Sequence, residues 1–430
     1  MKRTISLAIF ILSVMVSYAS TLLTPTQKAS ILAKFQTEVK YNFVHLDSLK
    51  CDWDSLCNSK FETIVNTPDD YSFQLEMDAL CAQLHDGHTS FWIDLQNSQP
   101  SDEWIRPLPF KTSRIGSGIY VTDVLSSVYA NKGVVVGSEI VKIDGKPISE
   151  YFATEIAPYL SSSTPQWTEW YGADEFELTK KPGVSPTTVT FKNKDGEIID
   201  VTAGRRIAWD INDKGETLAI QHKILPHNIG LLKIRSFQQG EFVIDSLANS
   251  LDSLENTEAM IIDVRNNTGG NSSNGEILLR VICSDTIPSF KWSTPQYNAA
   301  FASWRRPNPP YVEETNPIPA LGLYNKPIVV LINNGTFSAA EDFVNLFKGA
   351  KRGILIGEAT GGSTGNPIIV DLGFGAGARI CTRNEWLVDG GVFIGKGISP
   401  DIEVIQTPDV LYGKDNVLEK AIEYLHTTNR

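Results

Sequence analysis

The spacing of hydrophobic positions changes twice along the chain. Within residues 22–95, apolar side chains recur at about every fourth position, which predicts amphipathic helices. Residues 107–206 carry short strand-like runs separated by turns. From residue 228 onward, strand-like runs alternate with helical spacing, which predicts βαβ units and a mainly parallel sheet. The pattern therefore predicts an α/β multidomain protein. Its expected domains are 20–100 (helical), 101–206 (β-rich) and 207–430 (α/β core).

The first twenty residues have a different pattern. Lys2 and Arg3 precede an apolar run over residues 5–16, and small residues follow at Ser17 and Ala19. This arrangement is typical of a secretory signal peptide, with residues 1–19 removed after Ala19. It predicts a periplasmic or secreted protein. The apolar run is too short to span a membrane, and no later stretch reaches the roughly 20 apolar residues that a span needs.

The β-rich region contains a strand that runs into a hairpin turn. Apolar and polar side chains alternate up to Asp144-Gly145, which is a strong turn signal. Residues 137–148 resemble a recurrent stretch of PDZ domains, which bind a peptide terminus as an added strand. The stretch departs from that family at Ser138, where an aspartate is usual. Residues 150–185 form a long insertion rich in Trp and Tyr, which we expect to alter the usual peptide groove.

The α/β core contains two strand–helix–strand patterns. The first lies within residues 229–264, and the second occupies residues 327–357 around Ser338. Sites in such sheets lie at the carboxyl ends of the strands. Residues 288–325 lie between the two patterns and are rich in Pro, Trp and Tyr. Because this segment is too long for a plain connector, we expect it to form a strap over the site.

Composition narrows the possible functions. Of the 430 residues, 42% are hydrophobic and 20% are charged, as in ordinary globular proteins, and the formal net charge is -12. The acidic balance argues against nucleic acid or an anionic membrane as a partner. Five cysteines in an exported chain leave at least one unpaired. A Cys51–Cys57 disulfide, with Cys81 nearby, and buried free thiols are both open alternatives.

Ser338 lies where a buried strand turns into a helix. Residues 328–332 are an unbroken apolar run, and Phe343, Leu346 and Phe347 follow at helical spacing. Free N–H groups and the helix dipole stabilise negative charge at a helix N-terminus, as a serine nucleophile and its oxyanion require. A plain N-cap serine suits the same position. This stretch alone leaves both interpretations open.

A second polar turn follows an earlier strand of the core. Residues 263–271 come directly after an apolar run and contain Gly269 and Gly270. Two glycines allow a sharp turn with exposed N–H groups, which would act as oxyanion donors if they faced a nucleophile. Taken alone, the motif is better explained as an ordinary polar turn.

Four motifs occur together in one order. They are Asp263-x-Arg265-x-Asn267-x-Gly269-Gly270, Ser338-Ala339-Ala340-Glu341, Gly357-Glu358-x-Thr360-x-Gly362 and Gly397-Ile398-x-Pro400-Asp401-Ile402. In this order and spacing, the chain resembles the C-terminal processing (tail-specific) proteases and the tricorn-core proteases. The resemblance implies a helical domain, a PDZ-like insert and a crotonase/ClpP-like protease core. It also implies a serine peptidase that often cuts near the C-terminus of unfolded or tagged chains.

The resemblance assigns roles to individual residues. It implies Ser338 as the nucleophile, with the Ala339 N–H as one oxyanion donor. Gly269 or Gly270 is implied as the other donor. Processing proteases carry a lysine base in a T-x-G-K-G stretch, but this chain has Ser363 at that position. A Ser-Lys dyad in its usual form is therefore not expected.

The tricorn-like branch uses a histidine base instead. The stretch Leu84-His85-Asp86-Gly87-His88-Thr89 matches the position of that histidine, with His88 as the aligned residue. Histidine suits the role because its pKa lets it accept the serine proton near neutral pH. We therefore expect a pair of Ser338 and His88, in preference to His85.

This chain departs from the tricorn-like relay at two positions. The relay has a serine before the histidine, where this chain has Gly87, and a glutamate where this chain has Ile394. The group that orients the histidine is thus unidentified, although Asp86 is adjacent in sequence. Lys396 lies in the last motif and is a reserve candidate for the base. Glu341 is expected to be a first-turn helix residue that the helix dipole favours.

The sequence therefore predicts an exported serine endopeptidase that acts on peptides or unfolded proteins through an acyl-enzyme on Ser338. His85 and His88 lack the i, i+4 spacing and the glutamate of a zincin, and no phosphate-binding loop appears, so we expect neither a metal ion nor a cofactor. The alternative is a non-catalytic peptide- or lipid-binding protein on the same fold, as in the retinoid-binding modules that resemble this family. The missing glutamate keeps this alternative open.

Overall fold

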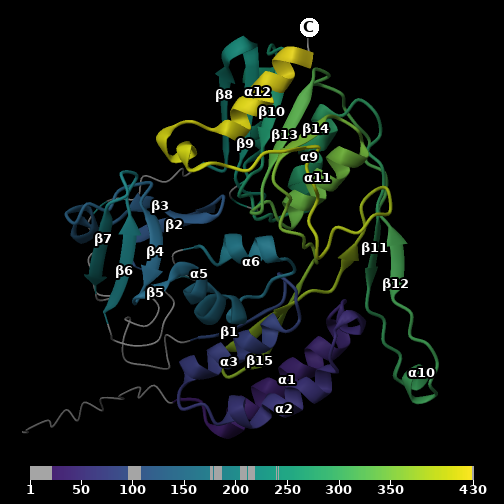
Figure 1. Cartoon of the computed structure of the whole chain (residues 1–430). Coiled ribbons are helices and arrows are strands. Elements are labelled where there is room, and N and C mark those ends of the chain that lie inside the picture. The colour runs from purple at the N-terminus through teal and green to yellow at the C-terminus, as the bar shows by residue number, and fades with distance from the viewer. Residues whose placement is uncertain are drawn as a thin grey trace, which may run out of the picture.

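Figure 1 shows the computed structural model of the chain, which describes residues 22–94, 108–174, 178, 186–203, 211, 218–238, 240 and 242–428. Within these residues, helices and four sheets form the mixed α/β multidomain architecture that the hydrophobic spacing predicts. The expected signal peptide, residues 1–19, lies outside the described residues, as does most of 175–185. None of the helices described is both long and apolar enough to cross a membrane.

Three helices form the N-terminal layer. They are α1 (Pro25–Asn42), α2 (Trp53–Val65) and α3 (Asp70–Ala82), with a short turn η1 (Leu46–Ser48). Thr24, Asp52 and Asp69 cap the three helices by accepting N–H groups of the first turn. The apolar faces of these helices share a core with β1 (Ser90–Ile93), β15 (Ile368–Gly373) and β16 (Ala376–Ile380). The small sheet β1-β16-β15 therefore ties the N-terminal helices to the C-terminal half of the chain.

The β-rich region forms its own sheet. Its strands, in the order β2-β3-β4-β6-β7 with β5 paired to β4, are β2 (Phe110–Ile115), β3 (Gly118–Val124), β4 (Glu139–Ile143), β5 (Lys146–Pro147), β6 (Thr187–Lys192) and β7 (Ile198–Ala203). The predicted turn at Asp144-Gly145 joins β4 to β5. Short helices fill the connections, namely α4 (Ser127–Ala130), α5 (Ile148–Tyr151), η4 (Phe152–Ile156), η5 (Ala157–Tyr159) and α6 (Pro165–Tyr171).

The core sheet has the order β18-β14-β13-β10-β9-β8. Its strands are β8 (Ile220–Leu225), β9 (Ile229–Ile234), β10 (Ala259–Asp263), β13 (Ile328–Ile332), β14 (Ile354–Gly357) and β18 (Ile402–Glu403). Every pairing is parallel except β8 with β9. The predicted mainly parallel sheet is therefore confirmed. β10 and β13 are buried along their whole length, which explains their unbroken apolar runs.

Helices cover both faces of the core sheet (Figure 1). One face packs against α8 (Ile244–Leu254), α9 (Ser272–Ile282) and α11 (Ala339–Gly349), and the other against α12 (Asn416–Thr428). Successive strand residues point to opposite faces, so Met260 belongs to the first core and Ile261 to the second. Two further turns are η6 (Pro226–Asn228) and η7 (Pro408–Tyr412).

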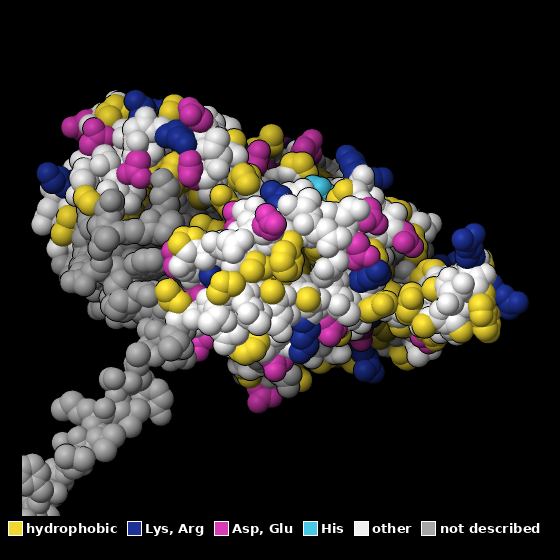
Figure 2. Space-filling view, turned by 90° about the horizontal axis from the view of Figure 1, so that it is seen from below, with side chains coloured by type: hydrophobic (Ala, Val, Ile, Leu, Met, Phe, Trp, Pro, Cys, Tyr) yellow, Lys and Arg dark blue, Asp and Glu magenta, His cyan; other side chains and the backbone are white. Residues whose placement is uncertain are grey.

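Residues 288–325 form an arm and not the expected strap. A small sheet, β12-β11-β17, contains β11 (Lys291–Thr294), β12 (Tyr311–Glu314) and β17 (Asn384–Glu385), and α10 (Ala299–Ser303) forms the tip between β11 and β12. Figures 1 and 2 show this tip projecting from the body of the protein. Trp304 near the tip is 62% exposed, and the Tyr297 ring contacts Tyr41 of α1 at 4.8 Å. The strap prediction was wrong, because the length of this segment serves an outward hairpin.

All five cysteines are free thiols in the structure. Cys57, Cys81, Cys283 and Cys381 are buried, and Cys51 is exposed. Of the two alternatives that the sequence leaves open, the structure has the unpaired thiols. Burial raises the pKa of Cys57 to about 12, so its thiol packs as a small apolar group.

Candidate active site

Ser338 lies at the carboxyl end of β13, at the N-cap of α11. Its backbone has φ 56° and ψ -128°, a conformation that a non-glycine residue rarely adopts. The Ser338 N–H donates to the Ser363 carbonyl at 3.1 Å, and the Phe337 N–H donates to the Asn267 carbonyl at 3.0 Å. These bonds hold the strained turn, which presents the Ser338 side chain above the sheet edge.

His88 lies in the turn between α3 and β1. Its side chain is fully buried, and its ring stacks on Phe337 at a centroid distance of 4.7 Å and an angle of 9°. Trp167 of α6 covers the other face of Phe337 at 3.8 Å. A side chain at Gly87 would place its Cβ 2.8 Å from Phe337 Cζ. Gly87 is therefore required by the close approach of this ring.

The structure brings Ser338, His88 and Ser363 into one line of hydrogen bonds. His88 Nε2 lies 2.9 Å from Ser338 Oγ, and His88 Nδ1 lies 2.8 Å from Ser363 Oγ. The Ser363 hydroxyl in turn lies 3.4 Å from Asp86 Oδ1. Asp86 is fully buried and also accepts the His88 N–H at 3.0 Å. This arrangement has the form of a nucleophile, a base and an orienting group.

Sequence reasoning missed Ser363 as the partner of His88. One signal in the sequence could have indicated Ser363. It lies in the loop that follows the second strand–helix–strand pattern, at the position where processing proteases have their lysine. In the structure, Ser363 Oγ lies 2.8 Å from His88 Nδ1, so a serine at this position reaches the histidine ring. The serine expected before the histidine is replaced by Gly87, and Ser363 takes its place from another segment.

The environment of His88 favours the neutral imidazole. Burial is the larger cause that lowers the pKa of His88 well below its ordinary value, and the positive charge of Arg379 lowers it further. The groups that face this ring are Asp86 from its own turn, Ser363, and Arg379 from β16. A neutral His88 can accept a proton, as a general base must.

The backbone N–H groups near Ser338 differ in their availability. The Gly269 N–H donates to Asn267 Oδ1 at 2.9 Å, so Gly269 is not a free oxyanion donor. Among the described residues, the N–H groups of Ala339 and Gly270 make no hydrogen bond. A Cβ at Gly269 would lie 2.8 Å from the Ala339 nitrogen, so this glycine is needed for close approach and not for donation. Ala339 and Gly270 are therefore the available donors.

Glu341 has a larger structural role than the expected helix-terminal one. It is fully buried, and its carboxylate accepts the N–H groups of Gly362 at 2.8 Å and Ser363 at 2.9 Å. The Thr360 hydroxyl also donates to it. Burial raises the pKa of Glu341 to about 8, while these hydrogen bonds act in the opposite direction. Glu341 thus fixes the loop that carries Ser363.

Two other candidates are not brought to Ser338. His85 is exposed on the turn, and Lys396, the reserve base, is an exposed residue outside the lining of the cavity described below. The main chain of Lys396 faces this region, since its carbonyl accepts from Gln166 at 2.8 Å. Because the side chain is exposed and does not line the cavity that contains Ser338, the structure does not support Lys396 as the base.

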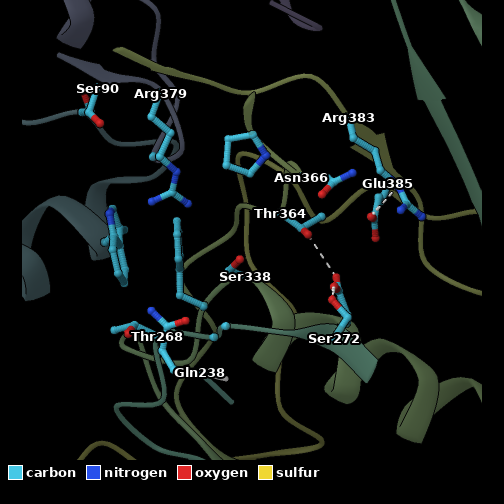
Figure 3. A pocket seen from close by; sticks show the side chains of 18 of the residues that line it. Ser90, Gln238, Thr268, Ser272, Ser338, Thr364, Asn366, Arg379, Arg383 and Glu385 are labelled. Carbon is cyan, nitrogen blue, oxygen red and sulfur yellow. Dashed lines mark hydrogen bonds and ion pairs between the residues drawn. The ribbon is translucent and has the colours of Figure 1, made fainter. Parts of the chain in front are cut away.

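Ser338 opens into a cavity of about 670 Å³ (Figure 3). The walls come from α6, the Gly269 turn, the Thr364 loop, and β15 and β16. Trp167 and Tyr171 of α6 line one side, so the described part of the Trp-rich insertion covers the site. Figure 3 shows Arg379 and Arg383 reaching the cavity from different sides. The shape and polarity fit an extended chain with some polar groups.

A group of three potential metal ligands lies next to the turn that carries His88. The donor atoms of His45, Asp86 and Cys381 fall within 4.8 Å of one another, and His45 Nε2 is buried without a hydrogen-bond partner in the described structure. Asp86 Oδ2 already accepts from the His88 N–H and from the Thr89 hydroxyl at 2.7 Å. A cation there would compete with the bonds that hold the His88 turn.

Comparison with known proteins assigns part of the chain to a family. The model named Peptidase family S41 matches residues 228–404, which include Ser338, Ser363 and the Gly269-Gly270 turn. This match covers less than half of the chain and identifies that segment as a peptidase S41 domain. Its matched part spans the core sheet from β9 to β18.

Two curated members of the processing-protease group resemble parts of this chain. The chloroplastic C-terminal processing peptidase of Tetradesmus obliquus is 28% identical over 186 residues, which cover 43% of this chain and 36% of that protein. The carboxy-terminal-processing protease of Bartonella bacilliformis is 34% identical over 97 residues, or 22% of each protein. The matched parts are thus well under two thirds of these S41 relatives.

Solved structures match over almost the whole chain. Mature CPAF complexed with lactacystin has a TM-score of 0.69 and 17% sequence identity, with 94% of this chain and 98% of that chain covered. A mutant form of CPAF has a TM-score of 0.72 and 16% identity, with coverage of 94% and 96%. At this identity the likeness concerns the fold, including the helical and β-rich regions outside the S41 match.

Proposed function

We propose that this chain is a serine peptidase that cleaves peptide bonds by acyl transfer. The observation that carries the proposal is the line of contacts from Ser338 Oγ to His88 Nε2, at 2.9 Å, and from His88 Nδ1 to Ser363 Oγ, at 2.8 Å. The match of residues 228–404 to Peptidase family S41 supports the same activity. The neutral histidine, the strained serine turn and the two unpaired N–H groups are the components that acyl transfer requires.

The proposed first step transfers the Ser338 proton to His88. For His88 Nε2 to accept this proton, Nδ1 carries the other one and donates it to Ser363 Oγ. Ser338 Oγ then bonds to the substrate carbonyl carbon, and the carbonyl electrons move onto oxygen. The N–H groups of Ala339 and Gly270 are proposed to stabilise that oxyanion. Asp86, linked through Ser363, stabilises the positive charge that His88 gains.

The remaining steps of the proposed reaction release the two products. The His88 imidazolium gives its proton to the leaving amine as the C–N bond breaks, which leaves an acyl ester on Ser338. A water molecule then attacks the ester, and His88 accepts the water proton. The Ser338–acyl bond breaks, and its oxygen regains a proton from His88. In this scheme Ser363 is a positioning residue, because it acts through the histidine.

We further propose that the substrate is an unfolded or C-terminally exposed polypeptide outside the cytoplasm. The names of the two curated relatives support C-terminal processing. The basic and apolar pattern of residues 1–19 supports export. The open cavity beside Ser338 accommodates an extended chain more readily than a folded domain.

The test compares wild type with Ser338→Ala and His88→Ala, using unfolded casein and a fluorophosphonate probe. The exposed Lys396→Ala variant serves as a control. We expect casein cleavage and probe labelling in wild type and Lys396→Ala, and neither in the other two variants. Cleavage that survives Ser338→Ala would overturn the assignment of the nucleophile. A wild-type protein that binds casein without cleaving it would instead favour the non-catalytic alternative.

A further inference from the structure

Arg379 places a positive charge in the wall of the cavity beside Ser338. It lies on β16, opposite Ser90 of β1 in the antiparallel register. The side chain is half-buried and lines the same cavity as Ser338. Figure 3 shows its guanidinium turned into the cavity, on the side of Ser90. The sheet that joins the N-terminal helices to the core thus presents a cation to the substrate space.

The Arg379 guanidinium has no partner among the described residues. No hydrogen bond or ion pair from it occurs in that part of the chain. Burial is the largest cause that lowers the pKa of Arg379, and the nearby charge of Asp86 acts in the opposite direction. A half-buried guanidinium with five donors and no protein acceptor among the described residues is an unusual arrangement. Such a group is relieved by a planar anion, and a carboxylate matches its fork geometry.

Arg383, which also lines the cavity, differs from Arg379 because it has interaction partners. Arg383 Nε lies 2.8 Å from Glu385 Oε1, and its guanidinium stacks on Trp292 at 4.6 Å. The nearby Asp342 carboxylate is also occupied, since it accepts from the Ser272 hydroxyl at 2.6 Å and the Thr364 hydroxyl at 3.0 Å. Asp342 is thus occupied by hydroxyl donors, and Glu385 forms the ion pair with Arg383. Among the described residues that line the cavity, Arg379 is the arginine without an ion pair.

We propose that Arg379 forms a carboxylate-binding subsite that selects the peptide segment next to the scissile bond. This inference rests on the proposed peptidase function of the same cavity. The carboxylate has two possible sources, namely an Asp or Glu side chain of the substrate or the C-terminal carboxylate of the peptide. Both would make the paired N–H···O bonds that the guanidinium lacks.

Binding of a carboxylate would also act on the base. The charge of Arg379 disfavours protonation of His88, and proton transfer from Ser338 creates that protonated form. A substrate carboxylate on Arg379 neutralises this charge at the moment of reaction. The subsite therefore couples recognition of the substrate to the basicity of His88, and it favours substrates that carry the anion.

The test maps cleavage sites and then measures matched peptides. Mass spectrometry of unfolded casein digests from wild type, Arg379→Gln and Arg379→Glu gives the sites. Peptides around the strongest site are then made with Glu, Gln or Lys at the flanking positions, and with a free or amidated C-terminus. The exposed Arg280→Gln on α9 is the control for loss of one arginine.

The expected result is a preference of about tenfold or more in kcat/KM for one carboxylate over its neutral counterpart in wild type and Arg280→Gln. Arg379→Gln should reduce the preference to within about twofold, and Arg379→Glu should reverse it toward a Lys-containing peptide. Preference for Glu over Gln identifies a side-chain source, and preference for the free acid over the amide identifies the C-terminus. Equal rates for all pairs in wild type would overturn the subsite. Absence of any Ser338-dependent cleavage would overturn the peptidase proposal itself.

A pH profile separates recognition from a general loss of structure. In wild type, the acid limb of kcat should lie at higher pH for the carboxylate peptide than for its neutral counterpart, because the bound anion offsets Arg379. In Arg379→Gln the two limbs should coincide. A difference that persists in Arg379→Gln would show that another group binds the carboxylate. A merely structural role for Arg379 would lower the rate without moving the limbs.

Discussion

Replacement of Ser363 by alanine tests the least expected contact of the site. Ser363 Oγ lies 2.8 Å from His88 Nδ1, and both side chains are fully buried. The substitution removes one hydroxyl and leaves the buried Nδ1–H without its acceptor. A buried donor that loses its partner costs about 1–3 kcal/mol. If this cost falls on the transition state, kcat should decrease by about 5- to 150-fold.

The assay is steady-state hydrolysis of a peptide from the strongest casein site. We expect kcat to decrease and KM to stay within about twofold, because Ser363 touches the histidine and not the substrate. The acid limb of the profile should also move to lower pH, since the protonated imidazole loses an acceptor. Thermal unfolding in parallel reports any loss of fold.

Ser250→Ala is a matched control within the same chain. Ser250 is also a buried serine, and its hydroxyl lies 2.9 Å from His222 Nδ1, away from the cavity. This variant removes the same kind of contact, so it should reproduce any general effect on stability with unchanged kcat. Wild-type kcat and an unmoved pH profile in Ser363→Ala would refute the orienting role. Equal losses of kcat in both variants would attribute the effect to stability.

Three further predictions concern the same site. Gly87→Ala should lower peptide hydrolysis by about tenfold or more, because its Cβ would lie 2.8 Å from Phe337 Cζ and displace the ring that stacks on His88; unchanged kinetics would contradict this. The acid limb of kcat/KM should lie below pH 6.5, since burial and Arg379 hold the pKa of His88 well below 6.5; a limb above that value would refute a neutral buried base. Thermal stability should fall as pH rises from 4.5 to about 8, because Glu341 keeps a proton in the native state that the unfolded chain loses. In Glu341→Gln, stability should therefore depend less steeply on pH over this range. An equally steep dependence would contradict the prediction.

The strand, turn and helix around Ser338 could be predicted because their signals are local. An apolar strand, a short polar turn and a helical repeat lie within twenty residues of Ser338, and parallel pairing of β10 with β13 follows from the same patterns. The Gly269 turn must then lie beside Ser338, since both follow neighbouring parallel strands. What the pattern could not show is which glycine keeps a free N–H. That depends on a hydrogen bond to the Asn267 side chain, which periodicity does not encode.

The base half depends on contacts between distant segments. His88 and Ser363 are 275 residues apart, and pairing of β1 with β16 brings their segments together. The sequence pattern predicted neither of these strands, and periodicity does not show which strands pair across such a distance. The prediction of a strap at residues 288–325 was wrong for a related reason. Its aromatic composition suggested a covering role, whereas the described part of the insertion at 150–185 supplies Trp167 to cover the site.

Gly87 and Ser363 are best understood as one change and not two departures. A serine at position 87 would put its Cβ against Phe337, the ring sandwiched between His88 and Trp167. Once the insertion packs Trp167 onto this stack, the turn before the histidine has room only for glycine. The orienting hydroxyl must then come from the other side of the imidazole, where the Glu341-bound loop carries Ser363. The aromatic cover and the position of the orienting serine are therefore coupled, so a chain with this stack should also carry a hydroxyl at the position of Ser363.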